Sequence, residues 1–115
     1  MGTDRDLCRT EIPPGTLYML ILRSLARLGP MHGYGIAQHI QDLSVDVLQV
    51  EEGSLYPALQ RMLIKGWVTA KWGRTENNRR ARYYRLTAAG KKQLNVEISE
   101  FEKVMRAITN VIQPA

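Results

Sequence analysis

A chain of 115 residues is long enough for one compact domain with a helical extension, but too short for a second substantial core. Its 16 Lys and Arg exceed its 11 Asp and Glu, and this net charge of +5 favours a polyanion as partner, nucleic acid before any other. Cys8 is the only cysteine, which excludes an internal disulfide, and neither a signal-type leader nor an apolar run of about 20 residues is present. We therefore expect a cytoplasmic protein without a membrane segment.

The positive charge is concentrated between residues 71 and 92. This stretch holds eight Lys or Arg against the carboxylate of Glu76, a net +7 that leaves the rest of the chain at −2. A run of charge is often only a solvated surface. Whether the basic stretch at residues 71–92 binds a polyanion therefore depends on the elements predicted around it.

The chain is expected to begin with a flexible arm at residues 1–12, which are polar and show no periodicity. A folded unit is expected at residues 13–87. Its first helix is predicted from Thr16 to Leu28, because apolar residues recur there at spacings of four and three and Gly29 and Pro30 follow. This helix should be amphipathic and buried.

A second, shorter helix is predicted after a turn at residues 32–35, with Ile36, Ala37, Ile40 and Leu43 facing the core. The third helix must begin near Gly53 or Ser54, because Pro57 lacks an N–H and fits best in a first turn. We expect Gly66 to end it.

The third helix has a polar outer face once its apolar residues are turned to the core. The side chains on or beside this face are Ser54, Tyr56, Gln60, Arg61 and Lys65. A polar, cationic face with an aromatic side chain near its beginning is typical of a helix that reads a DNA groove. A merely solvated face is the alternative.

Two strands are predicted after the third helix. Residues 67–72 alternate, with Val68, Ala70 and Trp72 on one side, and Tyr84 and Leu86 share a side of the second strand. The connection at residues 73–80 is too long for a two-residue turn and should project as a flexible basic loop. We interpret both tryptophans, Trp67 and Trp72, as packing residues of the core or hairpin.

The last helix, at residues 88–115, is predicted to be a dimerisation helix. Thr87 can cap it and Gly90 permits a close approach to the preceding domain. Apolar residues follow at alternating spacings of four and three, which is a heptad seam for a partner helix: Leu94, Ile98, Phe101, Met105, Ile108 and Ile112. The alternative is that the seam packs back on its own domain.

No constellation for catalysis or metal binding is recognised. His32 and His39 with Cys8 do not form a zinc-ligand pattern, and no phosphate-binding glycine loop or nucleophile with a base at a known spacing occurs. Arg5 and Arg9 beside Cys8 give only weak support for a redox-sensing thiol. We expect no enzyme, no metal and no cofactor.

Three segments carry a resemblance to a known family. They are His32-Gly33-Tyr34-Gly35-Ile36, Gly53-Ser54-Leu55-Tyr56-Pro57-Ala58-Leu59 through Gly66-Trp67-Val68, and Arg82-Tyr83-Tyr84-Arg85-Leu86-Thr87-Ala88-Ala89-Gly90. In this order and spacing they resemble the PadR family of bacterial transcriptional regulators, in particular its members with one short C-terminal helix. The resemblance implies an α+β, mostly α, winged helix-turn-helix with a C-terminal dimerisation helix.

The resemblance also implies residue roles. Ser54 and Tyr56 would contact phosphates or base edges at the start of the third helix, with Gln60, Arg61 and Lys65 further along it. Tyr34 would abut the DNA backbone. Three arginines of the wing would lie over phosphates or in the minor groove: Arg79, Arg80 and Arg82.

The expected function is that of a homodimeric regulator, a repressor, on a palindromic operator. Related drug-responsive members typically carry a tryptophan where this chain has Phe101, so an apolar or aromatic effector near Phe101 is expected, of a class that this difference leaves open. Two alternatives remain: ligand-independent DNA binding, and a winged helix that serves as a protein-interaction module.

Overall fold

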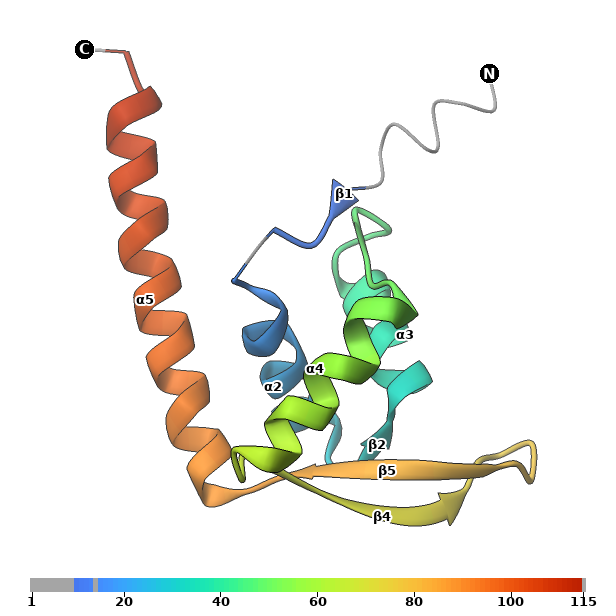
Figure 1. Ribbon diagram of the computed structural model, residues 1–115. Coiled ribbons are helices and arrows are strands. Elements are labelled where there is room, and N and C mark those ends of the chain that lie inside the picture. The colour runs from blue at the N-terminus through green and yellow to red at the C-terminus, as the bar shows by residue number, and fades with distance from the viewer. Residues whose placement is uncertain (1–9, 14, 115) are drawn as a thin grey trace, which may run out of the picture.

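The computed structural model describes residues 10–13 and 15–114, and these form a mostly helical α+β fold (Figure 1). The helices are α2 (Leu17–Leu28), α3 (Gly33–Leu43), α4 (Glu52–Ile64) and α5 (Ala88–Ile112). The strands are β1 (Thr10–Glu11), β2 (Met31–His32), β3 (Leu48–Gln49), β4 (Val68–Arg74) and β5 (Arg80–Leu86). Three helices followed by a hairpin and a terminal helix confirm the predicted winged helix-turn-helix.

The hairpin of β4 and β5 forms the base of the molecule in Figure 1. Its antiparallel register runs from Val68 opposite Leu86 to Arg74 opposite Arg80, and β2 adds to the other edge of β5, for the order β2-β5-β4. The sheet covers one end of the three-helix unit. The tip of the β4–β5 hairpin projects beyond the helices (Figure 1).

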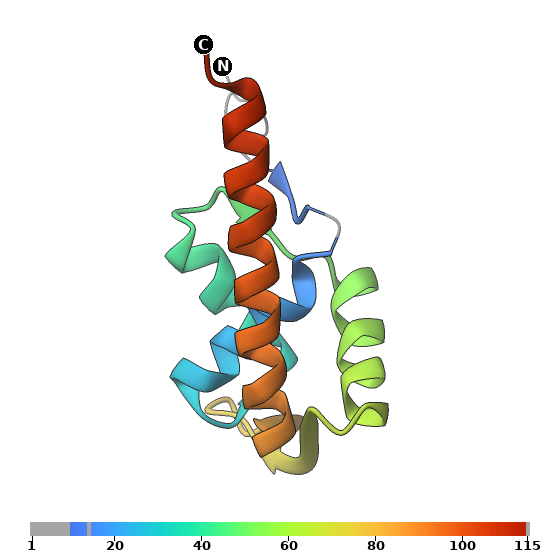
Figure 2. The same ribbon diagram turned by 90° about the vertical axis from the view of Figure 1, so that its left-hand side faces the viewer.

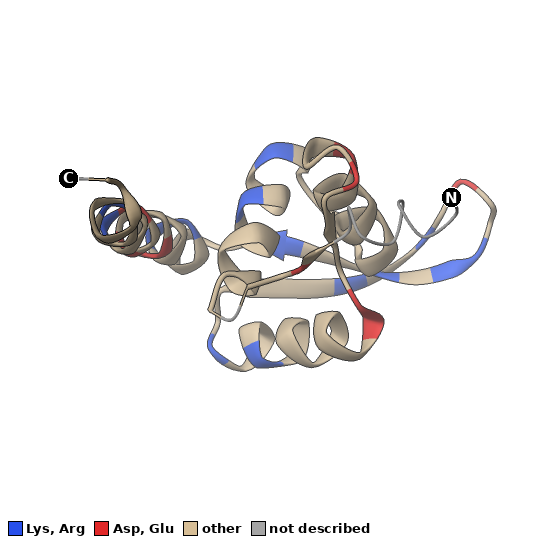
Figure 3. Cartoon of the chain, turned by 90° about the horizontal axis from the view of Figure 1, so that it is seen from above, with Lys and Arg blue, Asp and Glu red and all other residues tan. Residues whose placement is uncertain are grey.

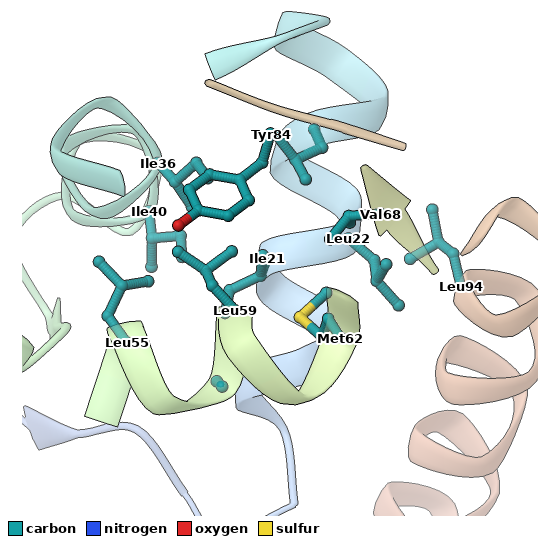
Figure 4. Packing of buried hydrophobic residues seen from close by; sticks show 12 residues of the cluster. Ile21, Leu22, Ile36, Ile40, Leu55, Leu59, Met62, Val68, Tyr84 and Leu94 are labelled. Atoms are coloured by element: carbon teal, nitrogen blue, oxygen red, sulfur yellow. The ribbon is translucent and has the colours of Figure 1, made fainter. Parts of the chain in front are cut away.

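The core lies between α2, α3, α4 and the inner part of the hairpin (Figure 4). Its buried hydrophobic residues are Ile21, Leu22, Leu25, Ile36, Ile40, Leu55, Ala58, Leu59, Met62, Val68, Tyr84 and Leu94. The prediction of a core-facing Leu43 is wrong, since this side chain at the end of α3 is 57% exposed.

Both middle helices begin earlier than predicted. Residues 33–35 belong to the first turn of α3, because the His32 side chain caps it by accepting a hydrogen bond from the Gly35 N–H at 3.0 Å. Helix α4 begins at Glu52, so Pro57 lies in the second turn and removes the bond that would reach the Gly53 carbonyl. Pro57 and Gly53 are both exposed, so the missing bond lies on the solvent side of the helix.

The folded unit extends further toward the N-terminus than residue 13. Strand β1 pairs in parallel with β3, and the Thr10 N–H donates to the Val47 carbonyl at 2.6 Å. Ile12 packs against the core. The part of the predicted arm that is described is therefore tied to the chain segment ahead of α4, whereas residues 1–9, Cys8 included, lie outside the described residues.

The junction between hairpin and α5 confirms the roles given to Thr87 and Gly90. The Thr87 hydroxyl accepts from the Gly90 N–H at 3.0 Å and donates to the Gly66 carbonyl at 2.7 Å. A Cβ at Gly90 would lie 2.1 Å from the Trp67 carbonyl oxygen, so no larger residue fits without moving backbone. This contact fixes the direction in which α5 leaves the domain. Figure 2 looks onto α5 and shows it running the full height of the molecule.

Candidate nucleic-acid interface

Helix α4 presents its predicted outer residues to solvent. Leu55, Ala58, Leu59 and Met62 are buried on one side, and the five residues predicted for the outer face, Ser54, Tyr56, Gln60, Arg61 and Lys65, are all exposed. Opposite the buried side lies Ile64, which is 78% exposed and was not among the predicted residues. The helical period alone could have indicated it.

Two cations of α4 are engaged with aromatic side chains on its flank. The Arg61 Nε donates to the Tyr18 hydroxyl, and the Lys65 Nζ lies 5.2 Å from the centroid of the Trp67 ring. Tyr18 and Trp67 meet edge to face at 5.7 Å. Trp67 is thus a packing residue, as predicted, and Arg61 and Lys65 are held at the side of the helix that faces α2.

The hairpin changes from apolar to basic along one face. Residues two apart in a strand share a face, and so do residues directly opposite each other in the register. One face of the hairpin therefore carries four such pairs: Val68 and Leu86, Ala70 and Tyr84, Trp72 and Arg82, and Arg74 and Arg80. The inner half of this face covers the core. The outer half carries three arginines and Trp72, and Figure 3 shows the Lys and Arg positions along the projecting end.

The prediction that Trp72 packs in the core or hairpin holds only for the hairpin. This side chain is 57% exposed, and the Arg80 guanidinium carbon lies 4.4 Å from the centroid of its ring. An arginine stacked on an indole gains about 0.5–1 kcal/mol at an exposed site. Trp72 therefore favours a position of Arg80 over its ring.

The hairpin tip is shorter and more ordered than the flexible loop predicted for residues 73–80. The strands continue to Arg74 and resume at Arg80, and the Thr75 N–H donates to the Arg79 carbonyl at 2.8 Å. Asn78 takes a left-handed conformation, φ 59°, and its carbonyl accepts from Arg74 Nη1 at 3.1 Å. These bonds present the exposed Arg79 on a preformed turn.

A hollow of about 1190 Å³ lies between the beginning of α3, the Tyr56 ring and the hairpin. Five of the residues predicted to bind DNA line it: Tyr34, Tyr56, Arg79, Arg80 and Arg82. Ser54 and Arg61 line a second hollow, of about 490 Å³, beside the N-terminal segment. Gln60 and Lys65 are exposed and line neither of these two hollows.

Two aromatic residues in the first hollow are positioned by their neighbours. Tyr34 is 68% exposed and its ring stacks on the ring of His32 at 6.4 Å. The Tyr56 ring packs on Gly33, where an added Cβ would lie 2.8 Å from Cε1. Burial, and then electrostatic interaction with Glu52 and Tyr84, raise the pKa of Tyr56 above its ordinary value. Like any tyrosine at neutral pH, it is protonated and can donate a hydrogen bond to a phosphate oxygen.

Helix α5 divides into two parts. Leu94 is buried in the chain's own core and Ile98, partly buried, packs against it, so these two positions of the predicted dimer seam make contacts within the chain. Beyond them, six apolar side chains are between 36% and 83% exposed: Phe101, Val104, Met105, Ile108, Val111 and Ile112.

The exposed apolar face of α5, these six residues, is broader than a two-position heptad seam. Val104 and Val111 widen it to an arc of about 120°. In Figure 1 this part of α5 stands away from the other helices. None of the described helices combines the length and apolar character that crossing a membrane requires.

Comparisons with known proteins agree with this architecture. Residues 21–96 match the model of the Transcriptional regulator PadR-like family. A solved transcriptional regulator of Clostridium thermocellum is 27% identical, covers 86% of this chain and 95% of its own, and superimposes with a TM-score of 0.78. A PadR-like transcriptional regulator of Bacillus cereus is 24% identical, with coverages of 88% and 95% and a TM-score of 0.72. An uncharacterized protein of Lysinibacillus sphaericus is 30% identical over 89% of this chain and 93% of its own.

Proposed function

Because the chain belongs to the PadR-like family of transcriptional regulators, whose members bind DNA, we propose that it represses transcription as a homodimer on a palindromic operator. The observation that carries the proposal is the hollow between α3, Tyr56 and the hairpin, which brings Tyr34, Arg79 and Arg80 beside helix α4. Helix α4 would enter the major groove, and the arginines of the hairpin would hold the adjacent phosphates. A small dimer that covers an operator represses by excluding the polymerase.

The homodimer is proposed from the exposed apolar face of α5. Six apolar side chains on one face of a helix cost free energy in water, at about 25 cal/mol for each Å² that remains exposed. A second copy offers the same face, and a two-fold axis between the two helices would cover both. The dimer would then present two copies of α4 to the two halves of a palindrome.

Titration of a labelled DNA duplex with the full chain at several salt concentrations tests the proposed function. We expect binding that weakens steeply with salt, with a slope near −0.9 in log affinity against log salt for each phosphate contacted. Duplex binding that does not respond to salt, or no binding to any duplex, would favour the protein-interaction module instead.

A small-molecule effector is proposed for the region around Phe101. This is the only phenylalanine of the chain, and it lies at the inner end of the exposed apolar face, where a planar apolar or aromatic compound could stack on it. A compound that favours one spacing of the paired α5 helices would change the separation of the two α4 helices and relieve repression.

We expect Phe101→Ala to lower the affinity for planar aromatic compounds by about 0.5–1.5 kcal/mol, because the stacking contact with the ring is lost. The loss of buried apolar area adds to this figure. DNA affinity should stay closer to that of the wild type. Calorimetric titration of wild type and variant, with and without operator, measures both. Phe101→Leu is the matched control, since it keeps an apolar side chain without the ring. Equal binding to wild type and Phe101→Ala would exclude Phe101 from the effector site.

A further inference from the structure

Helix α4 carries an uncharged ridge, defined here as Gly53, Pro57, Gln60 and Ile64. These positions follow one another at spacings of four, three and four, and they lie opposite the buried side of the helix. All four are exposed. If α4 enters a groove, this ridge goes deepest, because every other side chain of the helix points to the flank or to the core.

None of the charged residues lies on the ridge: these are Glu52 and Arg61 of α4 and Lys65 at its C-cap. Arg61 and Lys65 occupy one flank, where Tyr18 and Trp67 hold them. The floor of a DNA groove presents base edges and its walls are phosphates, so cations on a flank and neutral side chains on the ridge match a groove. The same arrangement does not suit an apolar protein partner, which would have to desolvate both cations.

The first half of the ridge has no side chain that can form a hydrogen bond. Gly53 has none at all, and a Cβ added there would meet no atom within 4 Å, so the helix can come close to the DNA at this end. Pro57 offers only a ring. Contacts that distinguish bases are therefore left to Gln60 and Ile64.

Building on the proposed function, we propose that Ile64 contacts the methyl group of a thymine and that Gln60 recognises an adenine about two base pairs away. A glutamine amide both donates and accepts, which matches N7 and the N6 amino group of adenine in the major groove. The 5-methyl group of thymine is the apolar feature of that groove. Four residues of helix rise by about 6 Å, which is close to two base-pair steps.

The test uses deoxyuridine, which pairs as thymidine does but lacks the 5-methyl group. Once an operator has been selected from random duplexes, each thymidine of one half-site is replaced in turn by deoxyuridine. We expect one replacement to weaken wild-type binding about fourfold, the equivalent of ~0.8 kcal/mol for a buried methyl-sized group. Ile64→Ala should bind both duplexes equally, because the partner of that methyl group is gone.

Gln60→Ala separates the two contacts. It should keep the response to deoxyuridine and lose about 5- to 150-fold of discrimination at one A·T pair, the equivalent of ~1–3 kcal/mol. Leu43→Ala is the matched apolar control, since Leu43 is also exposed but lies on α3 away from the ridge. It should respond to deoxyuridine as the wild type does.

The outcomes separate this inference from the function on which it rests. An operator bound tightly by the wild type with every deoxyuridine neutral, or an Ile64→Ala variant that keeps the deoxyuridine penalty, would overturn the role of Ile64 and leave DNA regulation standing. Failure to bind any duplex would overturn the proposed function and the inference together.

Discussion

Replacing Ile108 by aspartate is expected to turn the dimer into monomers and to lower operator affinity by roughly 10²- to 10⁴-fold. Ile108 lies within the exposed apolar face of α5, so the substitution would place an unpaired carboxylate of each copy in the interface, at a cost of several kcal/mol. A monomer loses the second half-site, whose binding within the dimer is an intramolecular event. Sedimentation equilibrium measures the assembly, and a titration with labelled operator measures the affinity.

Asn110→Asp is the matched control for Ile108→Asp. It adds the same charge on the same helical turn, but Asn110 is exposed on the opposite side of α5, and the dimer should persist. Ile98→Asp would be a poorer probe of dimerisation, because Ile98 packs on the chain's own core and its replacement would also weaken the packing of α5 on the domain. Circular dichroism should report equal helix content for Ile108→Asp and Asn110→Asp. A stable Ile108→Asp dimer would refute the proposed interface.

Replacing Arg79 and Arg80 together by alanine is expected to weaken binding to operator and to random duplex equally, by about tenfold or more for each arginine. Both side chains are exposed at the hairpin tip, and side chains at this position reach phosphates, which carry no base sequence. The slope of log affinity against log salt should become shallower by about 0.9 for each phosphate that the variant no longer neutralises. Fluorescence anisotropy over a series of salt concentrations gives both quantities.

Lys91→Ala with Lys92→Ala removes the same charge from the opposite end of the hairpin, where α5 begins. Both lysines are exposed, so the fold should be unaffected, and we expect only a small decrease in affinity from the changed net charge. If this control weakened binding as much as the arginine pair, net charge and not the hairpin tip would account for the affinity. If the arginine pair altered specificity instead, these arginines would read bases.

Sequence periodicity predicted the elements whose stability comes from one amphipathic face. Helix α2 occupies residues 17–28 as its apolar spacing indicated, and the alternation around Val68 and Tyr84 placed both on the buried face of the hairpin. The cap by Thr87 was predictable because it follows from local chemistry, and Gly90 permitted a close approach because it has no Cβ, although its partner there, the Trp67 carbonyl, is distant in sequence.

Features that depend on contacts distant in sequence were not predictable in this way. Nothing local indicates that Thr10 pairs with Leu48, or that Val45 in the connection before β3 takes φ 52°, an uncommon conformation for a β-branched residue. The early start of α4 could not be inferred from Pro57, because the missing N–H lies in an exposed second turn and not in the first turn, where proline fits best.

The terminal helix shows a further limit of sequence patterns. An uninterrupted spacing of apolar residues cannot tell a contact within the chain from a contact between chains, and α5 presents one stripe that is buried at its beginning and exposed further along. Leu94 and Ile108 differ in burial only because α2 packs against the beginning of α5, and sequence spacing does not show that contact. Of the ridge of α4, Gln60 was predicted on the outer face and Ile64 was not, because an apolar residue is ordinarily expected to face the core even where the helical period places it opposite the buried side.

Selection of bound duplexes from a random library, with the full chain as bait, tests the central claim most directly. Two copies of α4 related by a two-fold axis should enrich an inverted repeat, with half-sites centred about 34 Å apart or at a multiple of that distance. The enriched half-site should contain an adenine and a thymine about two base pairs apart. Enrichment of a single half-site without its inverted copy would contradict the dimeric architecture, and the absence of any enriched sequence would contradict sequence-specific regulation.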